Sequence, residues 1–147
     1  MDVLFGQPED IGSWMELVRR VSGNFPGLET DESIEEHRQT VLRFMEKKQA
    51  LCAKTEGNIA GVILFSRSRN MICCLAVSPL YRRQGIASAL LTKAIGELDR
   101  SRDITVSTFR ADDGKGTAPR ALYKKFGFTE GELIEEFGYP NQRFILH

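Results

Sequence analysis

The chain has 147 residues, enough for one domain with a real hydrophobic core. Hydrophobic residues make up 41% and charged residues 27%, a globular composition that excludes a disordered chain. The 20 Lys and Arg balance the 20 Asp and Glu, so the chain has no overall electrostatic attraction to nucleic acid or to an anionic membrane.

The first half of the chain predicts a strand, two helices and a hairpin, from the spacing of its apolar residues and its turn residues. In chain order these are a strand at residues 3–5, a helix at 11–21, a second helix capped by Asp31 or Ser33, and paired strands at 50–54 and 59–66.

The second half begins with an almost wholly apolar stretch. Residues 71–77 are therefore expected to form a central strand buried on both faces, which Pro79 ends. The elements expected after it are a helix at 86–98, a strand at 104–109, a helix at 118–126 that stops at Gly127, and a closing hairpin of 128–137 and 142–146.

The order of these elements indicates an α/β fold with a mixed, mostly antiparallel central sheet flanked by helices. No linker or internal repeat divides the sequence, so residues 1–147 are expected to form a single domain. An acidic start and the lack of a long apolar stretch predict neither an export signal nor a membrane span, and hence a cytoplasmic location.

Cysteine and histidine offer little chemistry. Cys52, Cys73 and Cys74 lie in apolar stretches without a CxxC pair, so we expect buried, reduced thiols. The two histidines, His37 and His147, are far apart in sequence, and no metal site is expected.

Residues 78–87 join the apolar strand to an amphipathic helix through a loop that contains Gly85. The first turn of a helix presents N–H groups without partners, and the helix dipole adds positive charge there. Gly85 lets a ligand approach the backbone, and Arg82 and Arg83 add charge at the rim. These features leave two interpretations open: a pyrophosphate site, or an ordinary turn with a solvated basic pair. A Walker A loop is excluded, because no Ser or Thr directly follows Lys115.

Two segments occur as an ordered pair. The first is Arg82-Arg83-Gln84-Gly85-Ile86-Ala87, preceded by the strand Cys74-Leu75-Ala76-Val77-Ser78-Pro79, and the second is Ala121-Leu122-Tyr123-Lys124-Lys125-Phe126-Gly127-Phe128. The first resembles the (Gln/Arg)-x-x-Gly-x-(Gly/Ala) pattern, and the second the ALY…GF segment, of the GCN5-related N-acetyltransferases, the GNAT superfamily. The resemblance runs from about Ala50 to the end of the chain.

The resemblance implies an enzyme that passes the acetyl group of acetyl-CoA to an unidentified amine. Backbone amides of the Gly85 loop would hold the CoA pyrophosphate, and the strand before it would pair with the pantetheine arm and face the thioester oxyanion. The implied cofactor-binding residues are Leu75, Ala76, Val77, Arg82, Arg83, Gln84, Gly85, Ile86, Ala87 and Ser88.

Tyr123 matches the position of the family's general acid, where a phenol would donate a proton or a hydrogen bond to the departing thiolate. A tyrosine that only packs the last helix is the alternative. Family members often carry Asn seven residues before this tyrosine, but Gly116 stands there. Either the loop backbone or Lys115 would then contact the cofactor.

The acceptor side is less defined. An amine must lose a proton before it attacks, yet the strand at 71–77 carries no acid. Two interpretations of the loop residues Phe25, Pro26 and Leu28 and of Tyr139 stay open: a lid and a wall over the acceptor, or a loop packed on the core. The candidate bases, each otherwise an ordinary surface charge, are Glu29, Asp112, Asp113, Glu135 and Glu136.

Two further hypotheses are kept. The lack of an obvious base, together with Gly116, favours a non-catalytic acyl-CoA-binding or sensing module. An acyl-enzyme on Cys74 would need an activated thiolate. The edge of the closing hairpin also offers a surface for a homodimer.

Overall fold

The computed structural model describes the backbone of residues 1–147 and every side chain except that of Asn24. Its seven-stranded sheet has the order β1-β2-β3-β4-β5-β7-β6. The strands are β1 (Asp2–Phe5), β2 (Ala50–Thr55), β3 (Asn58–Ser66), β4 (Met71–Val77), β5 (Ile104–Phe109), β6 (Thr129–Glu136) and β7 (Tyr139–Leu146). Neighbouring strands are antiparallel except for β4 and β5, which are parallel. The predicted fold class is confirmed.

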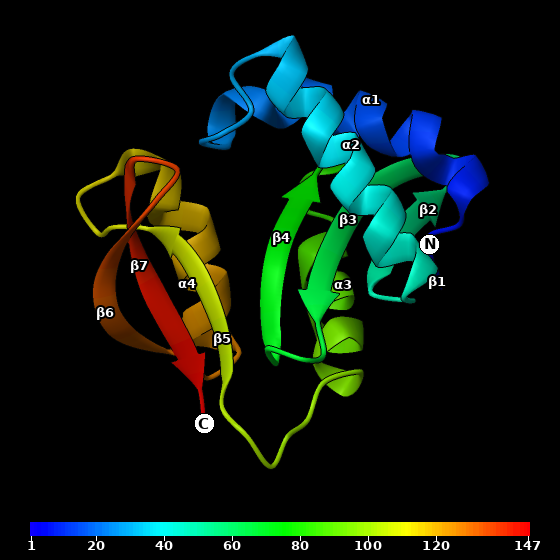
Figure 1. Ribbon diagram of the computed structural model, residues 1–147. Helices are drawn as coiled ribbons and strands as arrows, with labels where there is room; N and C mark the ends of the chain where they lie inside the picture. Colours follow the sequence, from blue (N-terminus) through cyan, green and yellow to red (C-terminus); the bar gives the residue numbers. More distant parts are fainter.

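Helices cover both faces of the sheet (Figure 1). They are α1 (Ile11–Val21), α2 (Asp31–Glu46), α3 (Ile86–Gly96) and α4 (Thr117–Lys125). The apolar core on one face contains residues of α1 and α2, with Trp14 and Val41 fully buried. The core on the other face contains residues of α3 and α4, among them Leu90 and Tyr123. None of these helices is both long and apolar enough to cross a membrane, within the part of the chain described.

The sheet divides into two lobes where β4 meets β5. The N-terminal lobe holds β1–β4 with α1, α2 and α3, and the C-terminal lobe holds β5–β7 with α4 (Figure 1). The register between β4 and β5 contains a single residue pair, Met71 opposite Thr105. The two strands therefore separate after their first residues, and their carboxyl ends lie apart.

Asn70 joins the two lobes at the closed end of this junction. Its buried side-chain amide donates to the carbonyl oxygens of Asp99 and Asp103 at 2.9 and 3.0 Å, and its Oδ1 accepts from the Asp99 N–H at 2.8 Å. Its own carbonyl accepts from the Thr105 N–H at 3.3 Å. Asn70 has a φ of +52°, a conformation that Asn tolerates better than most residues.

The prediction that β4 is buried on both faces is wrong. Leu64 lies opposite Cys74 but Phe65 lies opposite Ile72, so Cys73 is an extra residue, a β-bulge that bends the strand. Cys73 is exposed, which also corrects the prediction of three buried thiols. The apolar composition indicated two-sided burial, but the separation from β5 leaves this strand partly uncovered.

Two local boundaries also differ from the prediction. The second helix is capped by Thr30, not by Asp31 or Ser33, because the Thr30 hydroxyl accepts from the Ser33 N–H at 3.0 Å. The turn of the closing hairpin lies at Phe137-Gly138, both with positive φ, so β7 begins at Tyr139 and not at the expected residue 142. Gly127, with a φ of +93°, ends α4 as predicted.

Candidate active site

The edge of β4 that faces β5 carries unpaired backbone groups. The Ser78 N–H donates to the Ala60 carbonyl of β3 at 2.8 Å. Alternate residues of an antiparallel strand bond to the same neighbour, so Ala76 also faces β3, whereas Leu75 and Val77 direct their N–H and C=O groups towards β5. Because β5 has already separated there, these two residues present free backbone groups to the space between the lobes.

The N-terminus of α3 lies just after this edge. Its first bond runs from the Ala89 N–H to the Gly85 carbonyl at 3.0 Å, which leaves the N–H groups of Ile86, Ala87 and Ser88 without intrahelical partners. Arg83 and Gly85 both have positive φ, +63° and +74°. Turns of this kind gather N–H groups into a concave, anion-binding array.

The side chains of this loop suit a site that faces solvent. Arg82, Arg83 and Gln84 are exposed, and Ile86 is buried and anchors the helix on the sheet. No atom lies within 4 Å of the Cβ that a side chain at Gly85 would add. The space over this glycine is therefore open to a ligand.

Tyr123 lies on α4 and is 4% exposed. Its ring packs against Phe128 and Phe144, with centroids 5.6 and 6.1 Å away. Burial raises the pKa of the phenol, and the charge of Cys74 raises it further. The phenol therefore keeps its proton at neutral pH. Tyr123 belongs to the core cluster against which Leu75 and Val77 of β4 also pack.

Cys74 is unsuited to nucleophilic attack. Burial raises the pKa of its thiol to about 12, and the charge of Cys73 adds to the shift. A thiol with that pKa is protonated at neutral pH, and a reactive cysteine requires a lowered pKa. The acyl-enzyme hypothesis therefore has no support.

Gly116 is packed too tightly for a side chain. A Cβ there would lie 2.9 Å from Phe109 Cβ and 3.3 Å from the Arg110 carbonyl oxygen. The asparagine often found at this position in the family does not fit between α4 and the end of β5. Lys115 places its Nζ 5.8 Å from the centre of the Tyr139 ring, on the side of the closing hairpin.

A pocket lies between the end of β5 and the closing hairpin. It is lined by Arg110, Asp112, Asp113, Gly114, Tyr139 and Pro140. The Tyr139 hydroxyl donates to Asp113 Oδ2 at 2.6 Å, and this bond holds the pKa of the Asp113 carboxyl below its ordinary value. Tyr139 also packs edge-on against Phe109, 5.7 Å between centroids, so it forms one wall of the pocket.

Three of the candidate bases, Asp113, Glu29 and Glu136, differ in the groups to which they hydrogen-bond. Asp113 is engaged by Tyr139 and by the Lys115 N–H, and Glu29 accepts from the Gly27 N–H at 3.0 Å in its own loop. Glu136 accepts from Asn141 at 3.0 Å, and its charge contributes to the raised pKa of Cys73. Glu136 is the last residue of β6 and directly precedes Phe137, whose ring meets Gly27 of the other lobe.

A contact bridges the lobes at their open end. Phe137, at the tip of the closing hairpin, lies against Gly27 of the α1–α2 loop, where an added Cβ would be 3.0 Å from the Phe137 Cγ. Phe137 is nevertheless 81% exposed and has a φ of +53°, an unusual conformation for a bulky residue. Of the two interpretations of Phe25 and Leu28, the loop packed on the core is the one observed, because both residues pack against the core beneath α1 and α2.

Three residues that shape the site are not predicted from the sequence: Asn70, Arg120 and Phe137. Arg120 and Phe137 depend on partners 10 or more residues away in sequence, such as Glu130 and Gly27. No local pattern signals such contacts.

Residues 28–138 match the Acetyltransferase (GNAT) domain family. The chain belongs to the GNAT acetyltransferase family. As a GNAT protein it is an acyltransferase, and acetyl-CoA is the acetyl donor of this family. No curated protein matches the sequence.

Solved structures agree with this assignment at the level of the fold. An N-acetyltransferase from Staphylococcus aureus Mu50 superposes with a TM-score of 0.77 at 19% identity, over 99% of this chain and 100% of that chain. PaiA N-acetyltransferase from Thermoplasma acidophilum, solved in complex with coenzyme A, gives 0.70 at 17% identity, over 97% and 96%. Diaminobutyrate acetyltransferase EctA from Paenibacillus lautus, solved with its diamino acid substrate and coenzyme A, gives 0.71 at 21% identity, over 98% and 93%.

A metal site in a protein needs several ligating side chains close together. Among the described residues, no group of three His, Cys, Asp or Glu side chains is placed to hold a metal ion.

Proposed function

We propose that the protein acetylates a primary amine by direct attack of the amine on acetyl-CoA, with Tyr123 as the group that assists the departing thiolate. The observation that carries this proposal is the free edge of β4 at Leu75 and Val77, next to the separated β5 and packed against the same core cluster as the buried Tyr123. An extended pantetheine arm can pair with such an edge as an added strand.

The reaction needs little covalent chemistry from the protein. The amine nitrogen bonds to the thioester carbon, and a β4 N–H stabilises the oxyanion. The carbon–sulfur bond then breaks, and its electron pair goes to sulfur. Tyr123 hydrogen-bonds to and protonates this sulfur, and solvent returns a proton to the phenol. The proton lost by the amine passes to Glu136, directly or through water, and from there to solvent.

The cofactor would lie across both motifs. The N–H groups from Arg83 to Ser88 would bind the pyrophosphate, with Arg82 adding charge at the rim. Support comes from the open space over Gly85 and from the left-handed backbone at Arg83 and Gly85. At Gly116 the loop backbone is the remaining contact candidate, since Lys115 lies beside Tyr139.

Thiol release from acetyl-CoA across a panel of primary amines and peptide N-termini tests the activity. Tyr123→Phe should lower kcat about 100-fold or more, the lower end of general acid catalysis. Tyr81→Phe is the matched control, because among the described residues its hydroxyl hydrogen-bonds only with Asn58, at 3.4 Å. Tight acetyl-CoA binding with no turnover of any amine would contradict the proposal and favour a non-catalytic binding module.

A second experiment tests the proposed pyrophosphate-binding site at the Gly85 loop. Gly85→Val should weaken coenzyme A binding in calorimetry by about tenfold or more, since the side chain fills the anion site. Gly138→Val is the control, because Gly138 has a φ of +72° and equally open surroundings but lies in the other lobe. Equal affinities of the two variants would place the cofactor elsewhere.

A further inference from the structure

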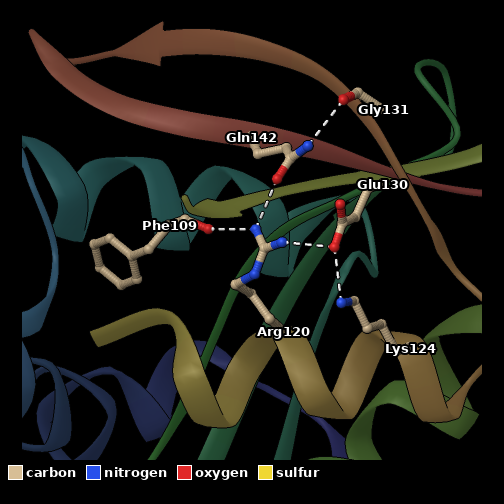
Figure 2. Close-up of polar contacts among 6 residues, drawn as sticks. All are labelled: Phe109, Arg120, Lys124, Glu130, Gly131 and Gln142. Atoms are coloured by element: carbon tan, nitrogen blue, oxygen red, sulfur yellow. Dashed lines mark hydrogen bonds and ion pairs between the residues drawn. The ribbon is translucent and has the colours of Figure 1, made fainter. Parts of the chain in front are cut away.

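Arg120 is buried in α4 although it carries a charge. It is 7% exposed, and three groups satisfy its guanidinium (Figure 2). Nη1 donates to the Phe109 carbonyl oxygen at 2.9 Å and to Gln142 Oε1 at 2.8 Å, and Nη2 donates to Glu130 Oε1 at 2.8 Å. A single side chain thus ties α4 to the last residue of β5, to β7 and to β6.

The network around Arg120 is fixed further out. Gln142 is buried and donates its amide to the Gly131 carbonyl at 3.0 Å, which sets the direction of its Oε1 towards Arg120 (Figure 2). Glu130 also pairs with Lys124 at 2.7 Å, on the exposed side. A buried charge held by several partners has a defined geometry, because loss of any partner leaves a desolvated polar group.

The same network reaches Tyr123. The Arg120 guanidinium lies 4.8 Å from the centroid of the Phe144 ring, and the Tyr123 ring packs against that same ring at 6.1 Å. Arg120 and Tyr123 are three residues apart on α4, so they lie on one side of the helix. The phenol is therefore held through its ring and through its helix, and Arg120 contributes to both.

We propose that Arg120 is a positioning residue for Tyr123, which it holds at the junction of the lobes through Phe144 and through the end of β5. This inference rests on the proposed role of Tyr123 in thiolate departure. A hydrogen bond to a departing sulfur requires placement within a fraction of an ångström, which packing and supporting hydrogen bonds supply. A residue that only stabilises the fold would affect Tyr123 and Tyr123→Phe proteins equally.

A double-mutant cycle separates these two roles. Arg120→Met should lower kcat by about tenfold when Tyr123 is present, with the KM for acetyl-CoA unchanged, and by less than about twofold in the Tyr123→Phe background. Lys124→Met is the matched control, since it removes the exposed member of the same network and should leave kcat unchanged. Equal losses of kcat in both backgrounds would overturn the proposal.

NMR of the tyrosine rings detects a change in the position of Tyr123 without measuring catalysis. The chain has three tyrosines, so ring-labelled protein gives few signals, and Tyr81→Phe and Tyr139→Phe assign the third. Arg120→Met should shift or broaden the Tyr123 signal and leave the others in place. If Tyr123→Phe keeps full activity but this shift occurs, the proposed acid role fails and the positioning contact stands. An unchanged Tyr123 signal would overturn the positioning role itself.

Arg120→Met risks misfolding, because it leaves Gln142 and Glu130 without their buried partner. Gln142→Leu is the milder variant, since it removes one acceptor and keeps the arginine. It should produce the same Tyr123-dependent loss of kcat at a smaller size. A Gln142→Leu protein that folds and retains full kcat, with an unchanged Tyr123 signal, would also overturn the proposal.

Discussion

The N-terminal and C-terminal lobes of the sheet are each stabilised internally by a different kind of contact. In the N-terminal lobe, β2 and β3 are almost completely buried between α1 and α2 on one face and α3 on the other. In the C-terminal lobe, β6 is largely exposed, and buried polar side chains do much of the joining. Arg120 with Gln142 is one such tie, and the half-buried Arg110, which donates to the carbonyls of Ile134 and Asn141, adds another.

This difference has a functional meaning. The N-terminal lobe supplies a rigid apolar base for the free β4 edge and the α3 N-terminus. The C-terminal lobe carries the directional groups, Tyr123 among them, and hydrogen bonds fix orientation where apolar packing alone does not. The lobes meet at Asn70 and again at Phe137 and Gly27, with the proposed reaction site between these two contacts.

The largest expected effect is a loss of stability when the Asn70 side chain is removed from the closed end of the junction between the lobes. Asn70→Ala removes the bonds to Asp99 and Asp103 and strains a residue with positive φ, so it should cost about 3 kcal/mol of unfolding free energy. Urea denaturation measures this loss. Asn70→Gly also removes these bonds but relieves the backbone strain, so it should be about 1 kcal/mol more stable than Asn70→Ala. If both variants lose less than about 0.5 kcal/mol of unfolding free energy, as surface substitutions do, the proposed role of Asn70 is wrong.

Filling the space at Gly116 should have the next largest effect. Gly116→Asn pushes against Phe109 and the Arg110 carbonyl and should cost about 1–3 kcal/mol in the same denaturation experiment, as overpacking does. Gly114→Asn is the control, because no atom lies within 4 Å of its added Cβ in the same short helix. If the two variants are equally stable, α4 does not pack against β5 as closely as described.

Opening the bridge at the other end should change selectivity rather than stability. Phe137→Asn keeps a residue that tolerates positive φ and removes the ring over Gly27, so amines with bulk next to nitrogen should gain about tenfold in kcat/KM relative to unbranched amines. Leu133→Asn, at a residue of the same hairpin that is 61% exposed, should leave the ratio unchanged. Identical ratios in both variants would show that the bridge does not restrict the acceptor.

The smallest expected effect concerns pH and the N-terminal lobe. Burial lowers the pKa of His37 on α2, so the unfolded chain binds a proton there more readily than the folded one. Stability is therefore lost as pH falls through the unfolded value of about 6.5. His37→Gln should flatten the dependence of the thermal midpoint on pH between pH 7 and 5. An unchanged slope in His37→Gln would contradict this account.

The order and type of the elements can be predicted from the sequence, because apolar periodicity and turn residues are local properties. The two motifs are also local, since the strand–glycine loop–helix junction and the segment around Tyr123 are contiguous. The end of α4 at Gly127 can also be predicted locally, because the turn after the helix requires a left-handed backbone conformation that glycine adopts easily.

The way in which these helices and strands pack together depends on contacts that no local pattern predicts. The exposure of Cys73 follows from the separation of β4 and β5, and the lack of room for a side chain at Gly116 follows from the approach of Phe109 and Arg120. Arg120 reads locally as a surface charge, yet it is buried because Glu130, Gln142 and a β5 carbonyl converge on it. Such contacts join residues far apart in the chain, and their geometry is set by packing that no local pattern encodes.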